Sequence, residues 1–123
     1  MRDIAMRFVA GINRRSVPDL AVLMTEDHVF IDSLGNRMEG REAMRSGWAG
    51  YFQMVPDYEI LVEETYGDGP VVVLLGVARG SFKGEKWAAP AAWRAEIRDG
   101  QVAQWRVYCD NEPIRRLMAK QGP

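Results

Sequence analysis

The sequence predicts an α+β fold in which helices come first and an antiparallel sheet follows. Before Pro56 the apolar residues recur at helical spacing, whereas beyond it they recur at every second position. The last two strands alternate cleanly between apolar and polar residues, so one face of the sheet is apolar and the other is polar and faces solvent. We therefore expect helices packed on one face of a curved sheet, in a single domain spanning residues 1–123.

Three helices are expected in the N-terminal half. The first covers Asp3–Asn13, where the apolar positions form one stripe. Ser16–Asp19 has the form of a capping box with a proline in the first turn, and it predicts a short second helix that continues through Met24. The third helix runs from Arg41 to about Val55 and ends at Pro56.

Five strands are expected around these helices. Gly76 and Gly80 lie inside the longest of them and indicate bends or bulges in a strongly curved sheet. Asp99-Gly100 is the strongest local hairpin signal in the chain. The expected strands are His28–Asp32, Tyr58–Tyr66, Val71–Phe82, Ala92–Arg98 and Gln101–Cys109, with turns at Leu34–Asn36, Gly67–Gly69 and Lys83–Lys86 and a helical turn over Ile114–Met118.

Composition excludes several classes of function. Sixteen basic residues balance seventeen acidic ones, so the charge gives no general attraction to nucleic acid or to an anionic membrane. One cysteine forms no internal disulfide, and one histidine excludes His-rich zinc sites. The N-terminal residues lack the apolar run of a signal peptide, and Val71–Val77 is far shorter than a membrane helix. We expect a soluble, cytoplasmic protein without metal, cofactor, nucleic-acid partner or membrane partner.

Four short segments, in this order, resemble the nuclear transport factor 2-like superfamily and, more narrowly, its SnoaL-like and ketosteroid-isomerase-like branch. They are Phe8–Asn13, Asp32–Gly35, Gly40–Met44 and Gly100–Tyr108. The resemblance covers nearly the whole chain. It implies a cone, in which a curved mixed or antiparallel sheet wraps around three helices, with an apolar pocket at the open end and commonly a homodimer.

The resemblance also implies roles for single residues. Asp32 falls where steroid isomerases keep their catalytic base, whereas Phe8 and Trp93 fall where they keep two donors to the oxyanion. Each oxyanion donor contributes on the order of 3 kcal/mol to catalysis. With both donors lost, the resemblance implies the fold and a pocket but not steroid isomerisation.

Two interpretations of Asp32 stay open. On an apolar strand face, burial raises the pKa of a carboxyl group and makes it a better base near neutral pH. At the end of a strand, the same side chain instead caps the turn that follows. His28 shares this strand face, but Phe30 separates it from Asp32, so we do not expect a His–Asp pair and interpret His28 as a surface or edge residue.

Aromatic side chains are more numerous than a core of this size requires, and some of them are expected to line an apolar pocket. The Trp93 indole is a candidate donor to a ligand carbonyl. The predicted ligand-binding residues are Phe8, Phe30, Trp48, Tyr51, Phe52, Trp93, Trp105 and Val107.

Near the C-terminus, alternation places Cys109 inward as a buried thiol and Asp110 outward, in solvent or in a dimer contact. SnoaL-like cyclases use a late carboxylate as acid or base, which makes Asp110 the candidate that this resemblance implies. The outward arginines are expected to pair with Glu59, Glu63 and Glu96 across strands, or to form a dimer interface. They are Arg79, Arg94, Arg98 and Arg106.

Three functions follow from these observations. The first is a cofactor-free isomerase or cyclase, in which Asp32 removes a proton next to the carbonyl of an apolar or polyketide-like substrate. The second is a binding protein that holds a small apolar molecule without transforming it. The third is a protein-interaction module whose working surface is the aromatic and arginine-bearing sheet face. In each case a homodimer formed through the sheet face is expected.

Overall fold

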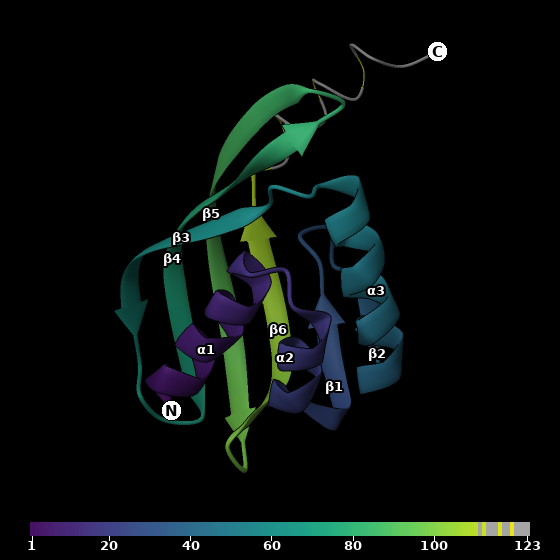
Figure 1. The fold of residues 1–123 in the computed structure, drawn as a ribbon. Coiled ribbons are helices and arrows are strands. Elements are labelled where there is room, and N and C mark those ends of the chain that lie inside the picture. The colour runs from purple at the N-terminus through teal and green to yellow at the C-terminus, as the bar shows by residue number, and fades with distance from the viewer. Residues whose placement is uncertain (111, 113–115, 117–118, 120–123) are drawn as a thin grey trace.

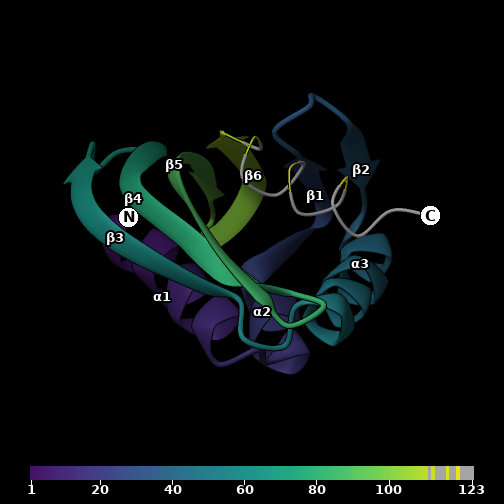
Figure 2. The ribbon, with the colours of Figure 1, turned by 90° about the horizontal axis from the view of Figure 1, so that it is seen from above.

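The computed structural model describes residues 1–110 together with residues 112, 116 and 119. Within residues 1–110, three helices lie on one side of a six-stranded sheet, so the expected α+β fold is confirmed. The strand order is β2-β1-β6-β5-β4-β3, and β1 runs parallel to β6 while the other neighbours are antiparallel. Seen from above, the sheet curves and the helices occupy its concave side (Figure 2).

The helices form where the apolar periodicity predicts them. Helix α1 covers Arg2–Asn13 and buries the expected stripe, and α2 covers Val17–Leu23. The Ser16 side chain caps α2 by accepting a hydrogen bond of 3.3 Å from the backbone N–H of Asp19. Helix α3 covers Arg41–Met54 and follows Gly40, which caps it with a positive φ of 98°. Helices α1 and α2 lie in front of the sheet, and α3 lies at its β1–β2 edge (Figure 1).

The strands agree with the alternation except at three places. The expected strand at His28 begins earlier, because β1 is Met24–Ile31, and β2, Arg37–Glu39, was not expected. The expectation that the fourth strand begins at Ala92 is wrong, because β5 covers Glu85–Arg98 and pairs from Glu85 to Glu96 with β4, Val71–Phe82. The remaining strands are β3, Glu59–Tyr66, and β6, Gln101–Cys109. The turn expected over Ile114–Met118 lies outside the described residues.

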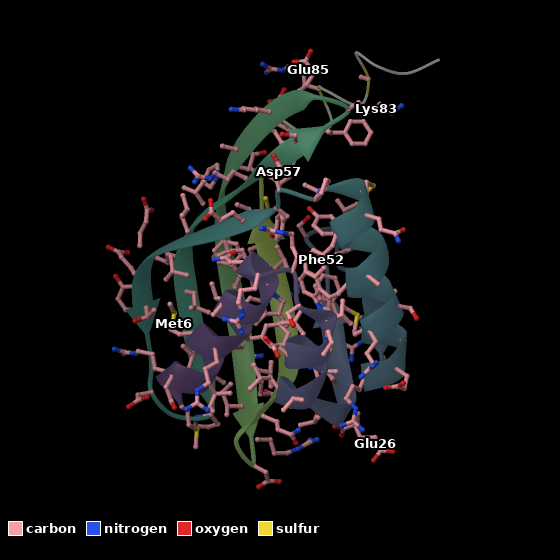
Figure 3. All side chains as sticks on the ribbon, viewed as in Figure 1. Met6, Glu26, Phe52, Asp57, Lys83 and Glu85 are labelled. Atoms are coloured by element: carbon pink, nitrogen blue, oxygen red, sulfur yellow. The ribbon has the colours of Figure 1, made fainter. Side chains whose placement is uncertain are left out.

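Gly76 makes the bend of the sheet possible. A Cβ atom at this position would lie 1.9 Å from the carbonyl oxygen of Leu61, a distance that no side chain tolerates. The register between β3 and β4 shifts directly opposite, between Val62 and Glu64. The predicted irregularity at this glycine is therefore a β-bulge, which increases the local twist of the paired strands. Beyond it, the β4–β5 hairpin extends past the end of the helices, with Lys83 and Glu85 near its tip (Figures 1 and 3).

The hydrophobic core lies between the helices and the concave face of the sheet. Alternation places Trp93 and Ala95 of β5 and Trp105 of β6 inward, and all three are fully buried. They pack with Phe8 and Ile12 of α1 in one continuous cluster. None of the helices in the described part of the chain is long and apolar enough to cross a membrane.

Candidate functional site

A cavity of about 350 Å³ lies between α3 and the sheet. It is bounded by the end of β1, the inner face of α3, the β4–β5 hairpin and the last residues of β6. Its size lies at the lower end of the range for small-molecule sites. The lining residues are Phe30, Asp32, Ser33, Met38, Met44, Gly47, Trp48, Tyr51, Met54, Val55, Tyr58, Ala78, Phe82, Trp87, Val107 and Cys109.

Interlocked aromatic rings form one wall of this cavity. The Trp48 ring packs edge-on against Phe30 and Tyr51, with centroids 5.9 Å and 6.3 Å apart, and stacks on Phe52 at 5.4 Å. Edge-to-face arrangements of this kind add stabilisation beyond the burial of apolar area. Figure 3 shows Phe52 on α3 among the side chains between this helix and the sheet. The wall is therefore rigid, and its shape is set before any ligand binds.

Gly80 allows the opposite wall to close in. A Cβ atom on Gly80 would lie 2.5 Å from Val55 and 3.3 Å from Trp87, and both of these side chains line the cavity. The missing side chain thus lets the hairpin pack directly on the end of α3. Trp87 in turn lies against Tyr58, with ring centroids 6.2 Å apart.

The polar groups of the cavity are few. Burial raises the pKa of Tyr51 and that of Tyr58 well above the ordinary value, so both phenols stay protonated. Burial, with a smaller contribution from the charge of Asp110, raises the pKa of the Cys109 thiol, which stays neutral as well. Within the described residues, no three His, Cys, Asp or Glu side chains come together as a metal site would require. The cavity therefore offers neutral hydrogen-bond donors in apolar surroundings.

Asp32 lines the cavity, but its carboxylate is used by the turn that follows β1. One oxygen accepts hydrogen bonds of 2.9 Å from the backbone N–H groups of Leu34 and Asn36, and the other accepts 3.1 Å from the Asn36 side chain. Burial by itself raises the pKa of Asp32, but these hydrogen bonds outweigh it and leave the pKa below its ordinary value. Of the two interpretations, the turn cap describes this geometry, and the direction of the pKa shift is opposite to the one that the base interpretation needs.

His28 differs from the surface or edge residue that was expected. Its side chain is fully buried and stacks on Phe8, with ring centroids 6.0 Å apart. Nδ1 lies 2.6 Å from the carbonyl oxygen of Val102, and because a carbonyl only accepts, Nδ1 carries the proton. Nε2 is sealed from solvent and has no partner among the described residues. The expectation was wrong because β1 is an inner strand, which lies between β2 and β6 in the sheet and is covered by α2 and α3.

The predicted ligand-binding residues separate into two groups. Phe30, Trp48, Tyr51 and Val107 line the cavity together with Asp32. Phe8, Phe52, Trp93 and Trp105 do not, because they fill the core below it; Phe8 and Trp105 contact each other with centroids 4.7 Å apart. The Trp93 indole N–H is buried, has no hydrogen-bond partner among the described residues and is not part of the cavity wall.

Two aromatic residues that the sequence analysis did not propose complete the site. Trp87 lines the cavity, but it lies before the position where β5 was expected to begin. Counting back from Trp93 in steps of two reaches Trp87, so extending the alternation would have placed it inward. Tyr58 shares the inward face with Ile60 and is buried. The signal for Trp87 is the alternation of the last hairpin extended toward the N-terminus, and the signal for Tyr58 is the alternation of the strand expected over Tyr58–Tyr66.

Residues at the end of β6 follow the alternation in part. Cys109 faces the cavity as expected, although it is half-buried rather than buried. Asp110 is exposed and accepts a hydrogen bond from the backbone N–H of Glu112. Of the outward arginines, Arg79 of β4 pairs with Glu59 of β3 across strands, as expected. Arg94 pairs with Glu96 on its own strand, β5, rather than across strands. Arg98 instead pairs with Asp27, and Arg106 stacks over Tyr108 at 4.9 Å.

Comparison with known families finds one match that spans most of the chain. Residues 5–105 match the model of the SnoaL-like domain. No curated protein is similar enough in sequence to match.

Solved structures share the fold over nearly their whole length. A provisionally assigned SnoaL-like polyketide cyclase from Shewanella denitrificans OS-217 superposes with a TM-score of 0.87 at 14% identity, covering 98% of this chain and 97% of the other. A protein with a ketosteroid isomerase-like fold from Catenulispora acidiphila, crystallised with trimethylamine, gives 0.85 at 21% identity, with coverages of 98% and 97%. An LEH-like epoxide hydrolase from M. tuberculosis gives 0.83 at 14% identity, covering 96% and 88%. At these identities the similarity shows the fold alone.

The buried imidazole predicts a pH-dependent stability. Burial lowers the pKa of His28 below 6.5, although the hydrogen bond to Val102 and the charge of Asp27 oppose it. Below pH 6.5 the unfolded chain therefore binds more protons than the folded one. The contribution of His28 to the free energy of unfolding should be complete above about pH 7 and should fall on acidification, by at most about 1.4 kcal/mol per pH unit. Urea unfolding between about pH 5 and 7 measures this slope, and His28→Gln should flatten it. An equally steep slope in the variant would contradict this role.

Proposed function

Because the chain belongs to the SnoaL-like domain family, we propose that it binds a small apolar molecule in the cavity between α3 and the sheet. The cavity itself is the observation that supports this most directly. Its walls are largely aromatic and aliphatic, and burying apolar ligand surface against them is favourable. A domain that worked only as a protein-interaction module would not need an open space beside a tightly packed core.

The class of ligand follows from the size and chemistry of the walls. A volume of about 350 Å³ suits a molecule of two or three fused rings rather than a long chain. One of the structures with the same fold is described as a polyketide cyclase, and the ligand class expected here, an apolar molecule bearing a carbonyl group, is compatible with that description.

Catalysis by Asp32 is the alternative use of the same site. The position of Asp32 on the cavity wall favours it. Against it, three hydrogen bonds stabilise the ionised carboxylate, which lowers its affinity for a proton and weakens it as a base. We therefore favour ligand binding over proton abstraction as the function of this site.

The proposal predicts saturable binding of an apolar probe. Titration of the protein with 2-ethylnaphthalene should change the fluorescence of Trp48 and Trp87, which line the cavity. Ala78→Leu places a larger side chain in the cavity and should weaken this binding by about tenfold. Ala88→Leu, an equivalent change at an exposed position of β5, is the matched control and should bind as the wild type does. Absence of saturable binding to the wild-type protein would contradict the proposed function.

The preference for ligand binding over catalysis predicts how the Asp32 carboxyl group titrates. Its carboxyl carbon, followed by NMR between about pH 2 and 6, should titrate below 3.8, because the hydrogen bonds in the turn favour the ionised form. Asp32→Asn removes this signal and identifies it. A pKa well above 3.8 would contradict this preference and favour Asp32 as a general base.

We propose further that two copies pair through the outer face of the sheet. The outer-face patch consists of Leu61, Leu75, Val77, Pro90, Ala92 and Tyr108. The paired registers bring these residues side by side on the face opposite the helices. The solvent face of an antiparallel sheet is commonly polar, so this apolar patch is unusual. A patch of this kind is self-complementary under two-fold symmetry.

Light scattering after gel filtration tests this pairing. The wild-type protein should have the mass of a dimer, because pairing removes the outer-face patch from water. Leu75→Lys introduces a charge into the patch and should raise the dimer dissociation constant by more than about tenfold. Leu34→Lys, at a side chain that is 73% exposed in the β1–β2 turn, should leave the mass unchanged. A monomeric wild-type protein would contradict the pairing.

A further inference from the structure

We propose that the hydroxyl groups of Tyr51 and Tyr58 form a polar subsite in the cavity that donates hydrogen bonds to an acceptor oxygen, such as the ketone oxygen of a neutral apolar ligand. This inference rests on the proposed function and specifies it. The cavity decides that an apolar molecule binds, whereas the tyrosine pair decides which apolar molecules bind best and where their oxygen lies.

The two tyrosines converge from different elements. Tyr51 projects from the last turns of α3, and Tyr58 lies between α3 and β3. Both line the cavity, and their rings meet edge-to-face with centroids 4.9 Å apart and an interplanar angle of 86°. Cys109, at the end of β6, lines the same cavity. The cavity wall thus contains three neutral donors.

Neither hydroxyl forms a hydrogen bond with another described residue, and neither oxygen is fully buried, although the Tyr58 side chain as a whole is only 6% exposed. Tyrosine hydroxyls in apolar surroundings usually have a partner, because a polar group without one costs free energy. The buried indole N–H groups of Trp93 and Trp105 also have no partner within the described part of the chain, but they lie in the filled core, away from the cavity. The two hydroxyls differ because the residues that carry them line an open space. A ligand acceptor can satisfy them there.

The backbone around Tyr58 is held from three sides. Arg15 donates to the Tyr58 carbonyl at 2.9 Å. The Asn13 side chain exchanges two hydrogen bonds with the backbone of Ile60, at 2.9 Å and 2.8 Å. Asp57 accepts from the backbone N–H and the hydroxyl of Ser81 at 2.9 Å and 2.6 Å. These contacts position Tyr58 before a ligand arrives, so little conformational entropy is lost on binding.

The charges around the cavity select a neutral ligand. None of the described residues that line it is Lys, Arg or His, so an anionic ligand would lose its hydration without gaining a counter-charge. Asp32, which is ionised at neutral pH, would also repel an anion. A ketone oxygen needs donors and no counter-charge, which is what the protonated phenols supply.

Three probes of one shape test the subsite: 2-acetylnaphthalene carries a ketone, 2-ethylnaphthalene lacks it, and 2-naphthoate replaces it with an anion. The wild-type protein should bind the ketone about fivefold more tightly than the ethyl compound, which corresponds to one net hydrogen bond, and should bind the anion most weakly. The double variant Tyr51→Phe/Tyr58→Phe should remove the preference for the ketone, so that it binds 2-acetylnaphthalene and 2-ethylnaphthalene with equal affinity.

The matched control is Tyr66→Phe, which removes an exposed hydroxyl that donates to Glu64 and should keep the preference. The melting temperature of the ligand-free double variant should equal or exceed that of the wild type, because no hydrogen bond is lost; a marked decrease would show a structural role and overturn the subsite. A preference for the ketone that persists in the double variant would overturn it too. Absence of binding by all three probes would instead contradict the proposed function itself.

Discussion

The site depends on the bend of β4 and β5. The carbonyl of Leu61 approaches β4 so closely at Gly76 that any other residue would push β3 away, and Gly80 admits Val55 and Trp87 in the same way. With both glycines in place, the β4–β5 hairpin leans over the end of α3, where Trp87 meets Tyr58. Straighter strands would leave the helix end exposed to solvent, with no second wall opposite Trp48. The cavity therefore depends on the close packing that Gly76 and Gly80 allow because they have no side chain.

The same bend divides the interior into two parts. In the lower part, α1 lies flat on the sheet, and Phe8, Trp93 and Trp105 fill the space completely. Polar groups buried there, such as Nε2 of His28, have no partner in the part of the chain that the structure describes, which costs free energy that the surrounding apolar packing offsets. In the upper part, α3 diverges from the sheet, and the space between them stays open. The positions associated with oxyanion donors, Phe8 and Trp93, belong to the filled part, so the polar groups available to a ligand come from α3 and the segment after it.

Local patterns predicted much of this arrangement. The stripe of α1, the cap at Ser16 and the alternation of the last hairpin each report contacts made within one or two elements, and the structure agrees with them. Asp32 shows how such patterns can remain ambiguous. A strand-end aspartate followed by Leu34–Asn36 fits both a pocket base and a turn cap, and only the hydrogen bonds of the folded chain identify the cap. Trp87 was missed because no strand was assigned to residues 87–91, whereas β5 begins at Glu85 and carries the alternation through them.

The sequence by itself determined the order of the elements, the face that each presents to the core and the limits of the chemistry, since one histidine and one cysteine leave little besides carboxylates and phenols. These properties follow from local periodicity and composition. The tertiary structure alone decided which inward residues fill the core and which border the cavity. Trp105 and Val107 lie on the same face of β6, yet Trp105 is fully buried in the core and Val107 lines the cavity. Their difference depends on how far α3 lies from the bent sheet, and no periodicity within a strand records that separation.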